Sequence, residues 1–302
     1  MSKIAFLAGG GTAPELMAEA VLALAAVARL HGLSFEEVHA PFGGVAVARA
    51  GQSFPASTRA AVLAADAVLV AGAEEPALAE VMAELDLRAR VTRVRFGHTD
   101  DVAFVAPLEA EAEEWTLEAA FRIAESRSMR LAVVGDTAWN EIADTVALGH
   151  EHVQVEHLSP RVAVPLAAFN ASRFDVVAVA AAWAEPIVEI AAAPAEARVA
   201  AHALLAEHGP SLFVPSPDGG FAIAGSGSVN PSSMLLAAAL VLEHALGSPA
   251  AAATLAGAVS AALVDGPQTP DLLRRGVGAT TREFTSSVMA GFQLSMPWGS
   301  AA

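Results

Sequence analysis

Short apolar runs alternate along the chain with longer segments in which apolar residues recur every three or four positions. The short runs are bounded by glycine, proline or charged residues, as buried strands are. Strands that alternate with helices indicate an α/β fold with a largely parallel sheet covered on both faces. The predicted strands are Lys3–Ala8, Phe35–Ala40, Ala67–Ala71, Val102–Val105, Leu131–Val134, Val153–His157, Val176–Ala180 and Ser211–Val214.

The longer segments predict helices between these strands. Ser57 is the expected N-cap of one helix, because a hydroxyl accepts a hydrogen bond from a free backbone N–H of the first turn. Asn230 and Pro231 open an apolar helix that ends near Gly247. The other predicted helices are 14–30, 111–126, 139–148, one after the strand at Val176 and one or two beyond Gly247.

Composition narrows the class of protein. The 302 residues carry 17 basic and 33 acidic side chains, and a net charge of −16 repels a phosphate backbone, which argues against a nucleic-acid partner. The absence of cysteine excludes disulfides, thiolate metal sites and a cysteine nucleophile. The first apolar run breaks quickly into glycine, and the run 234–242 is too short to span a bilayer. We therefore expect a cytoplasmic protein with no membrane segment.

The stretch RFDVVAVAAAWAEPIVE, residues 173–189, is the most informative. It predicts a buried strand that leads into a helix carrying Glu185 and Glu189. Residues four positions apart lie on the same helix face, so the two carboxylates point the same way. They follow the carboxyl end of a strand, which is where ligands bind in open α/β sheets.

This stretch resembles the metal-binding signature of the isocitrate and isopropylmalate dehydrogenase family. Segments 8–16, 41–47, 54–72, 228–247 and 269–288 are similar to further family segments, in the same order. The resemblance implies a two-domain isopropylmalate dehydrogenase-like fold, with a largely parallel sheet flanked by helices and a cleft between the domains. The expected first domain combines 1–97 and 197–302, and the second is 98–196.

The resemblance also implies a reaction that the residues support poorly. Family members oxidise a 2-hydroxy acid with NAD or NADP and decarboxylate it at a bound Mg²⁺ or Mn²⁺. Glu185 and Glu189 stand where the family has aspartates, and Arg161 stands at the position of the third acidic ligand. A guanidinium repels a cation. Our hypothesis is that Arg161 pairs with Glu185 or Glu189 and takes the cation's place; the alternative is an ordinary surface arginine.

The catalytic and substrate positions are altered in the same way. Asp136 is kept, but Thr137 replaces the family's lysine, and the chain has no tyrosine for the second proton-transfer step. Arg88 matches one arginine that binds substrate carboxylates. Trp183 stands where the family has phenylalanine, so it either packs in the core or lines a changed pocket. The nearby arginines form either a residual anion patch or a solvated basic edge; they are Arg90, Arg93 and Arg95.

The segment VPSPDGGFAIAGSGSVNP, residues 214–231, is similar to the family's cofactor loop. Gly225 and Asn230 are retained, and Gly10 and Gly11 belong to the opening glycine turn. Proline and alanine replace the family's adenine-stacking histidine and ribose-binding acid at 217 and 222, and Gly10 replaces an aspartate. We therefore expect weak NAD binding or none.

Three functions remain open. The first is a repurposed family member, a pseudoenzyme, that binds a partner or a small acidic metabolite without a cofactor. The second is a diverged enzyme that acts on a small hydroxy or dicarboxylic acid without NAD. The third is a true NAD(P)- and Mg²⁺- or Mn²⁺-dependent dehydrogenase with an unusual site. By resemblance we expect a homodimer built on apolar helices such as 234–242, although the family's dimer arm is shortened to about 109–115.

Overall fold

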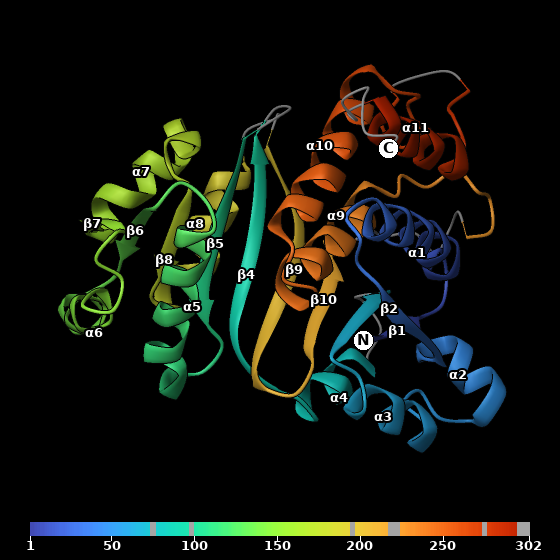
Figure 1. Ribbon diagram of the computed structural model, residues 1–302, viewed down its shortest axis with the longest axis horizontal. Helices are drawn as coiled ribbons and strands as arrows, with labels where there is room; N and C mark the ends of the chain where they lie inside the picture. The colour runs from blue at the N-terminus through green and yellow to red at the C-terminus, as the bar shows by residue number, and fades with distance from the viewer. Residues whose placement is uncertain (73–76, 97–99, 194–196, 217–223, 274–276, 295–302) are drawn as a thin grey trace. The chain divides into compact units, whose positions relative to one another are not determined.

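The structure is a computed structural model that describes residues 1–72, 77–96, 100–193, 197–216, 224–273 and 277–294 (Figure 1). It divides into two compact units. The first combines Met1–Glu84 with Leu212–Ala302, and the second is Leu85–Ser211. Within both, helices flank strands that are mostly parallel, which confirms the predicted α/β class.

In the first unit, the strand order is β2-β1-β3-β10, and β1 pairs in parallel with both β2 and β3. Helix α1 carries a proline in its first turn, where no N–H is needed, with Glu15 at its positive end and Arg29 at its negative end. The elements are β1 (Ser2–Ala8), α1 (Ala13–Leu30), β2 (Phe35–Pro41), α2 (Gly43–Ala50), α3 (Ala56–Leu63), β3 (Ala67–Ala71), α4 (Ala77–Ala83), β10 (Ser211–Pro215), α9 (Ser232–Leu240) with a π-helical turn Val241–Ala245, α10 (Pro249–Asp265) and α11 (Thr281–Leu294).

In the second unit, the strand order is β9-β4-β5-β8-β6-β7. Strands β5, β8, β6 and β7 are parallel neighbours, whereas β4 is antiparallel to both β5 and β9. The elements are β4 (Asp86–Phe96), β5 (Asp100–Pro107), a 3₁₀ turn (Ala110–Ala112), α5 (Glu113–Glu125), β6 (Arg130–Val134), α6 (Thr137–Ala147), β7 (Gln154–Leu158), α7 (Pro160–Asn170), a 3₁₀ turn (Ala171–Arg173), β8 (Val176–Val179), α8 (Ala181–Ala192) and β9 (Ala197–His208).

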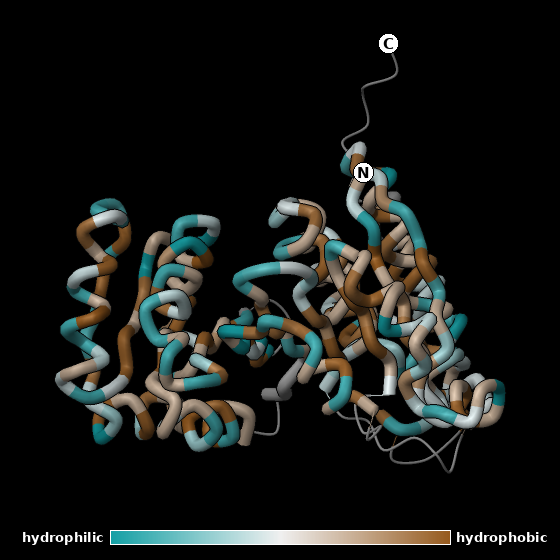
Figure 2. Tube along the Cα trace, turned by 90° about the horizontal axis from the view of Figure 1, so that it is seen from below, coloured by the Kyte–Doolittle hydropathy of each residue, from teal (hydrophilic) through white to brown (hydrophobic). Residues whose placement is uncertain are grey.

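The alternation of side chains along the strands gives the second unit two packed faces. Val177 and Val179 of β8 belong to a core cluster with Ile187 of α8 and Ala163 of α7. The intervening residues point to the opposite face, where α5 packs on β4, β5, β6 and β8. Figure 2 shows the hydrophobic segments running through the inside of each unit and hydrophilic ones at the outer turns. Among the described helices, none combines the length and hydropathy needed to cross a membrane.

Several local predictions need correction. Helix α3 begins at Ala56 with Pro55 as its N-cap, so Ser57 lies inside the first turn. The hydrophobic pattern does not predict β9, whose alanines and leucines favour a helix. Because β9 pairs with β4, and β4 with β5, all three strands lie in the second unit. The boundaries of the units therefore differ from the expected 97/98 and 196/197, which placed β4 and β9 in the first domain.

A histidine joins α5 to the turn that follows α6. His150 lies 2.7 Å through Nδ1 from Oε1 of Glu125 and 3.0 Å through Nε2 from Oε2 of Glu118. Its ring stacks on Phe121 with centroids 5.0 Å apart, and the side chain is 11% exposed. Burial alone lowers the pKa of His150, but the hydrogen bonds and charges of Glu125 and Glu118 outweigh it and raise the pKa. The protonated imidazole is therefore the form that binds these helices together.

His150→Gln is expected to lower the free energy of unfolding most at acidic pH. The folded pKa lies above the unfolded value of about 6.5, so the ionic contribution is complete below that pH and is lost as pH rises through the folded pKa. Urea unfolding should give a deficit of about 1–2 kcal/mol at pH 5.5 and a smaller one at pH 8.5. His152→Gln, at an exposed site, is the control. A deficit independent of pH would contradict the assignment.

Candidate functional site

The sequence-predicted residues of the second unit gather at one edge of its parallel strands. Only one or two residues separate β6, β7 and β8 from the helices that follow them, α6, α7 and α8. Because these strands are adjacent and parallel, their carboxyl ends meet at the same edge. That edge carries the following candidates: Asp136 and Thr137 at the start of α6, Arg161 in the first turn of α7, and Trp183 and Glu185 in the first turns of α8.

Glu185 has an arginine partner from β4. Nη1 of Arg90 lies 3.4 Å from Oε1 of Glu185, and the two side chains are 29% and 74% exposed. Glu189 is exposed and forms no ion pair with any described residue. The two carboxylates that resemble metal ligands therefore differ, because only Glu185 has a fixed positive charge beside it.

Arg161 does not take the role that the sequence predicts. Its side chain is exposed on the first turn of α7, and no ion pair joins it to Glu185 or Glu189, all three being described residues. The predicted pairing with either glutamate does not form within this single chain. Arg90 pairs with Glu185 instead because β4 runs alongside β5, under α8, a packing that no local pattern around Arg161 reveals.

Asp136 has a structural role at the start of α6. Its carboxylate accepts a hydrogen bond of 3.0 Å from the backbone N of Trp139, so it is the N-cap of that helix. Trp139 is buried, and a Cβ at Gly135 would lie 2.4 Å from its indole, so glycine is required there for close packing. Thr137 is exposed.

Arg88, the candidate substrate arginine, is already neutralised by two acids. It lies 2.9 Å from Asp86 and 3.1 Å from Glu207 of β9. Asp86 and Glu207 also lie near His208, and the ligand atoms of these three residues are close enough to hold a cation. The guanidinium of Arg88, however, already pairs with both carboxylates. Trp183 is 40% exposed, so of its two predicted roles the structure favours a surface or pocket position over the core.

A part-buried polar pair beside Arg90 was not predicted. His202 of β9 faces Thr92 of β4, with Nδ1 3.0 Å from Oγ1. Burial, and then the positive charge of Arg90, lower the pKa of His202 to about 4. The imidazole is therefore neutral at pH 7. Sequence reasoning missed His202 because β9 itself was not predicted.

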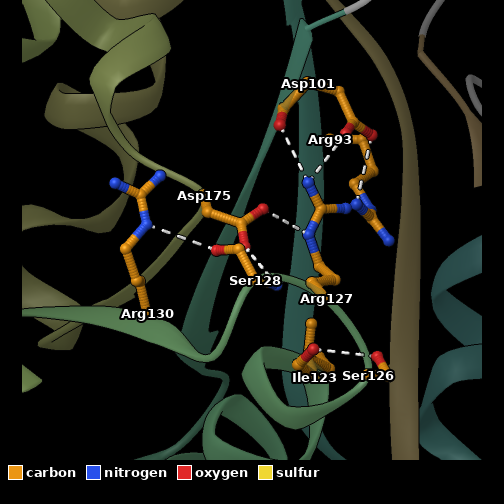
Figure 3. Close-up of polar contacts among 8 residues, drawn as sticks. All are labelled: Arg93, Asp101, Ile123, Ser126, Arg127, Ser128, Arg130 and Asp175. Carbon is orange, nitrogen blue, oxygen red and sulfur yellow. Dashed lines mark hydrogen bonds and ion pairs between the residues drawn. The ribbon is translucent and has the colours of Figure 1, made fainter. Parts of the chain in front are cut away.

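The other two arginines of β4 are neither a surface patch nor a solvated edge. Arg93 and Arg95 are buried, and burial lowers the pKa of Arg95. Nη1 of Arg93 donates to Asp101 at 3.1 Å, and Asp101 also accepts from Arg127 at 2.8 Å (Figure 3).

In the first unit, the opening glycine turn and the start of α1 lie against the end of the loop that resembles the family's cofactor loop. Gly11 has φ 62°, a conformation that favours glycine, and Gly10 accepts a hydrogen bond from Ala13 as α1 begins. Oε2 of Glu15 accepts a 3.0 Å bond from the backbone N of Gly227. Residues 217–223 lie outside the described residues, and with them the altered positions 217 and 222. The described end of the loop is thus held to the start of α1 by the carboxylate of Glu15.

The retained loop residues stabilise the fold. Gly225 has φ 73°, which favours glycine whatever the ligand. Asn230 is buried and donates from Nδ2 to Oγ1 of Thr269 at 2.9 Å, while Oδ1 accepts from the backbone N of Ser232 at 2.8 Å. Both ends of the Asn230 amide are therefore bonded to protein groups at the start of α9.

The residues at the α8 edge do not fit a divalent cation. Mg²⁺ and Mn²⁺ require several oxygen ligands in a compact cage. Here one carboxylate has a guanidinium 3.4 Å away, the other is unpaired on the surface, and an arginine stands at the third position. The Arg90 guanidinium beside Glu185 opposes the binding of a further positive charge there.

Comparison with known proteins matches the resemblance seen in the sequence. The family model described as isocitrate/isopropylmalate dehydrogenase matches residues 99–288. A 3-isopropylmalate dehydrogenase from Streptococcus mutans is 28% identical over 347 residues, covering 96% of this chain and 99% of that protein. One from Bacillus cereus is 28% identical over 341 residues, covering 95% and 96%. Both alignments are longer than this chain, so the relatives have segments that it lacks.

Solved structures show the same fold. A β-decarboxylating dehydrogenase from Thermococcus kodakarensis superposes with a TM-score of 0.81 at 20% identity, covering 98% of both chains. An isocitrate dehydrogenase from Methylococcus capsulatus gives 0.74 at 18% identity, covering 97% of this chain and 100% of that one. At these identities the likeness is evidence for the fold alone.

Asn230→Ala is expected to destabilise the protein because the side chains and backbone it bonds are left without partners in a buried position. Urea unfolding should show a loss of about 1–3 kcal/mol. Ser226→Ala, at an exposed site in the same loop, should change stability by less than about 0.5 kcal/mol. Unchanged stability in Asn230→Ala would mean that Asn230 serves a ligand and not the fold.

Proposed function

Because the chain belongs to the isocitrate/isopropylmalate dehydrogenase family, we propose that it keeps the family fold but not NAD-dependent, metal-assisted oxidative decarboxylation. The observation that carries the proposal is the ion pair between Arg90 and Glu185, 3.4 Å apart. A fixed guanidinium at this acid supplies the positive charge that a cation would bring, without open coordination positions for a substrate. The lost lysine and tyrosine positions support the same conclusion, since no proton-transfer pair of the family kind remains.

A small acid is the ligand best suited to the same edge. Arg90 is part-exposed, and the neighbouring His202 is neutral, so the guanidinium has only one carboxylate, that of Glu185, bonded to it among the described side chains. Trp183 adds exposed aromatic surface on α8. This supports both the first function, a binding protein for a small acidic metabolite, and the second, a diverged enzyme that acts on a small hydroxy or dicarboxylic acid without NAD.

The subunit is proposed to form a homodimer, on a surface other than the expected one. The helix at 234–242 lies in the core of the first unit, since all its hydrophobic side chains are buried, so that expectation is corrected. Exposed hydrophobic residues instead lie on α7 and α8, which pack together: Val162 is 49% exposed, Phe169 91% and Trp183 40%. A second copy of the chain would cover this apolar surface with an equally apolar one, and the family resemblance favours such a dimer.

A thermal-melt titration tests the loss of family chemistry. We expect no shift with Mn²⁺, NAD or NADP, alone or together, and a shift with at least one 2-hydroxy dicarboxylate. A ligand at a hundredfold excess over Kd stabilises the folded state by about 2.7 kcal/mol, so binding would be plain. A Mn²⁺ shift that disappears in Glu185→Gln but persists in Glu141→Gln, an exposed α6 control, would show a surviving metal site and overturn the proposal.

Phe169→Asp tests the dimer. Light scattering after gel filtration should give twice the 30.7 kDa chain mass for the unmodified protein and the single-chain mass for the variant, because a charge would be buried in an apolar contact. Leu148→Asp replaces an equally apolar residue, 78% exposed after α6, and should remain dimeric. A monomeric unmodified protein, or a dimeric Phe169→Asp variant, would refute this interface.

A further inference from the structure

The second unit contains a cavity at the edge opposite to the family site. It has a volume of about 560 Å³, within the range of small-molecule sites. Its walls come from the amino ends of β6, β7 and β8, whereas α6, α7 and α8 begin at the carboxyl ends of the same strands. No residue of the Arg90–Glu185 edge lines it.

The two acids of this cavity are fully engaged. Asp175 accepts from Nε of Arg127 at 2.6 Å, from the backbone N of Ser128 at 3.0 Å and from the Ser128 hydroxyl (Figure 3). Glu156 accepts from one terminal nitrogen of Arg173 through both oxygens, at 3.0 and 2.8 Å. The negative charge of Asp175 is therefore compensated by Arg127, and that of Glu156 by Arg173 at the surface.

The remaining cation of the cavity wall is poorly bonded. Arg130 donates only through Nε, 3.4 Å from Oγ of Ser128, and its two terminal nitrogens have no bond to any described residue. In Figure 3 those nitrogens carry no dashed line. The side chain is exposed, so it keeps a planar pair of donors for an incoming acceptor.

Two neutral donors from other elements line the same cavity. The side-chain amide of Gln154 on β7 and the hydroxyl of Ser172, in the turn before β8, have no partner among the described residues. Phe174, buried and covered by the Arg173 guanidinium 5.4 Å from its ring centre, adds an apolar wall. A guanidinium, an amide and a hydroxyl that line one cavity beside an apolar wall match a small molecule with a carboxylate and a short carbon skeleton.

We propose that this cavity, defined by Arg130, Gln154 and Ser172, is a binding site for a small organic carboxylate, separate from the family site. Arg130 holds the carboxylate through its terminal nitrogens, and the amide and hydroxyl bind the polar remainder. The engaged acids make the wall rigid before the ligand arrives, since Asp175 is anchored by Arg127, which is itself bonded to Asp101 at the start of β5. A preformed wall reduces the conformational entropy that side chains lose when the ligand binds.

Isothermal titration calorimetry at low salt with acetate, succinate, malate, citrate and inorganic phosphate tests the site. At least one carboxylate should bind the unmodified protein, and Arg130→Gln should bind it at least about tenfold more weakly, because a charge-assisted pair is lost. Ser172→Ala should weaken it less. Arg49→Gln, at an exposed arginine outside the cavity, should bind as the unmodified protein does.

Each other outcome overturns the inference. The inference fails if no member of the panel binds, if Arg130→Gln binds as tightly as the unmodified protein, or if phosphate binds as tightly as the carboxylates. Loss of binding in Arg90→Gln while Arg130→Gln binds normally would place the ligand at the family edge. That last result would refute this site and leave the proposed function standing, so the two proposals fail separately.

Discussion

The parallel register of β5, β8, β6 and β7 is the constraint on which the second unit depends. Parallel neighbours must be joined by crossover segments, so every strand is followed by a helix that begins at the same edge. That requirement places Asp136, Arg161 and Glu185 at one edge of the sheet although they are far apart in the sequence. It also leaves the amino ends of the strands at the other edge, where the cavity containing Arg130 lies. One backbone rule therefore separates the two candidate sites.

The arginines of β4 pair with different acids and lie at different depths in the second unit. Arg88 is held between Asp86 and Glu207, Arg93 bonds Asp101 inside the unit, and Arg90 reaches Glu185 on the surface. The desolvation cost of a buried guanidinium is offset only where an acid faces it. The exposed pair at Glu185 contributes little stability, of the order of 1 kcal/mol at most.

Much of this arrangement could be predicted from sequence. The strands at 3–8, 67–71 and 131–134 were found almost to the residue because apolar runs bounded by glycine or charge have few other folded states. The family was recognisable because its glycine turns and helix starts are local. The strand β9 was missed because alanine and leucine favour helix, and the pairing with β4 overrides that preference. Because β9 was missed, His202 was missed as well. The pairing of Glu185 with Arg90 was missed because it depends on the position of β4 in the sheet.

By itself the sequence determined the α/β class and the resemblance to the dehydrogenase family, because these depend on residue identity and short-range periodicity. Tertiary structure alone decided that Arg90 and not Arg161 meets Glu185, that Asn230 bonds Thr269, and that the 234–242 helix is core. Charge pairing depends on distances across strands and helices that are remote in the chain. Those distances are set by sheet order and register, which no local pattern specifies.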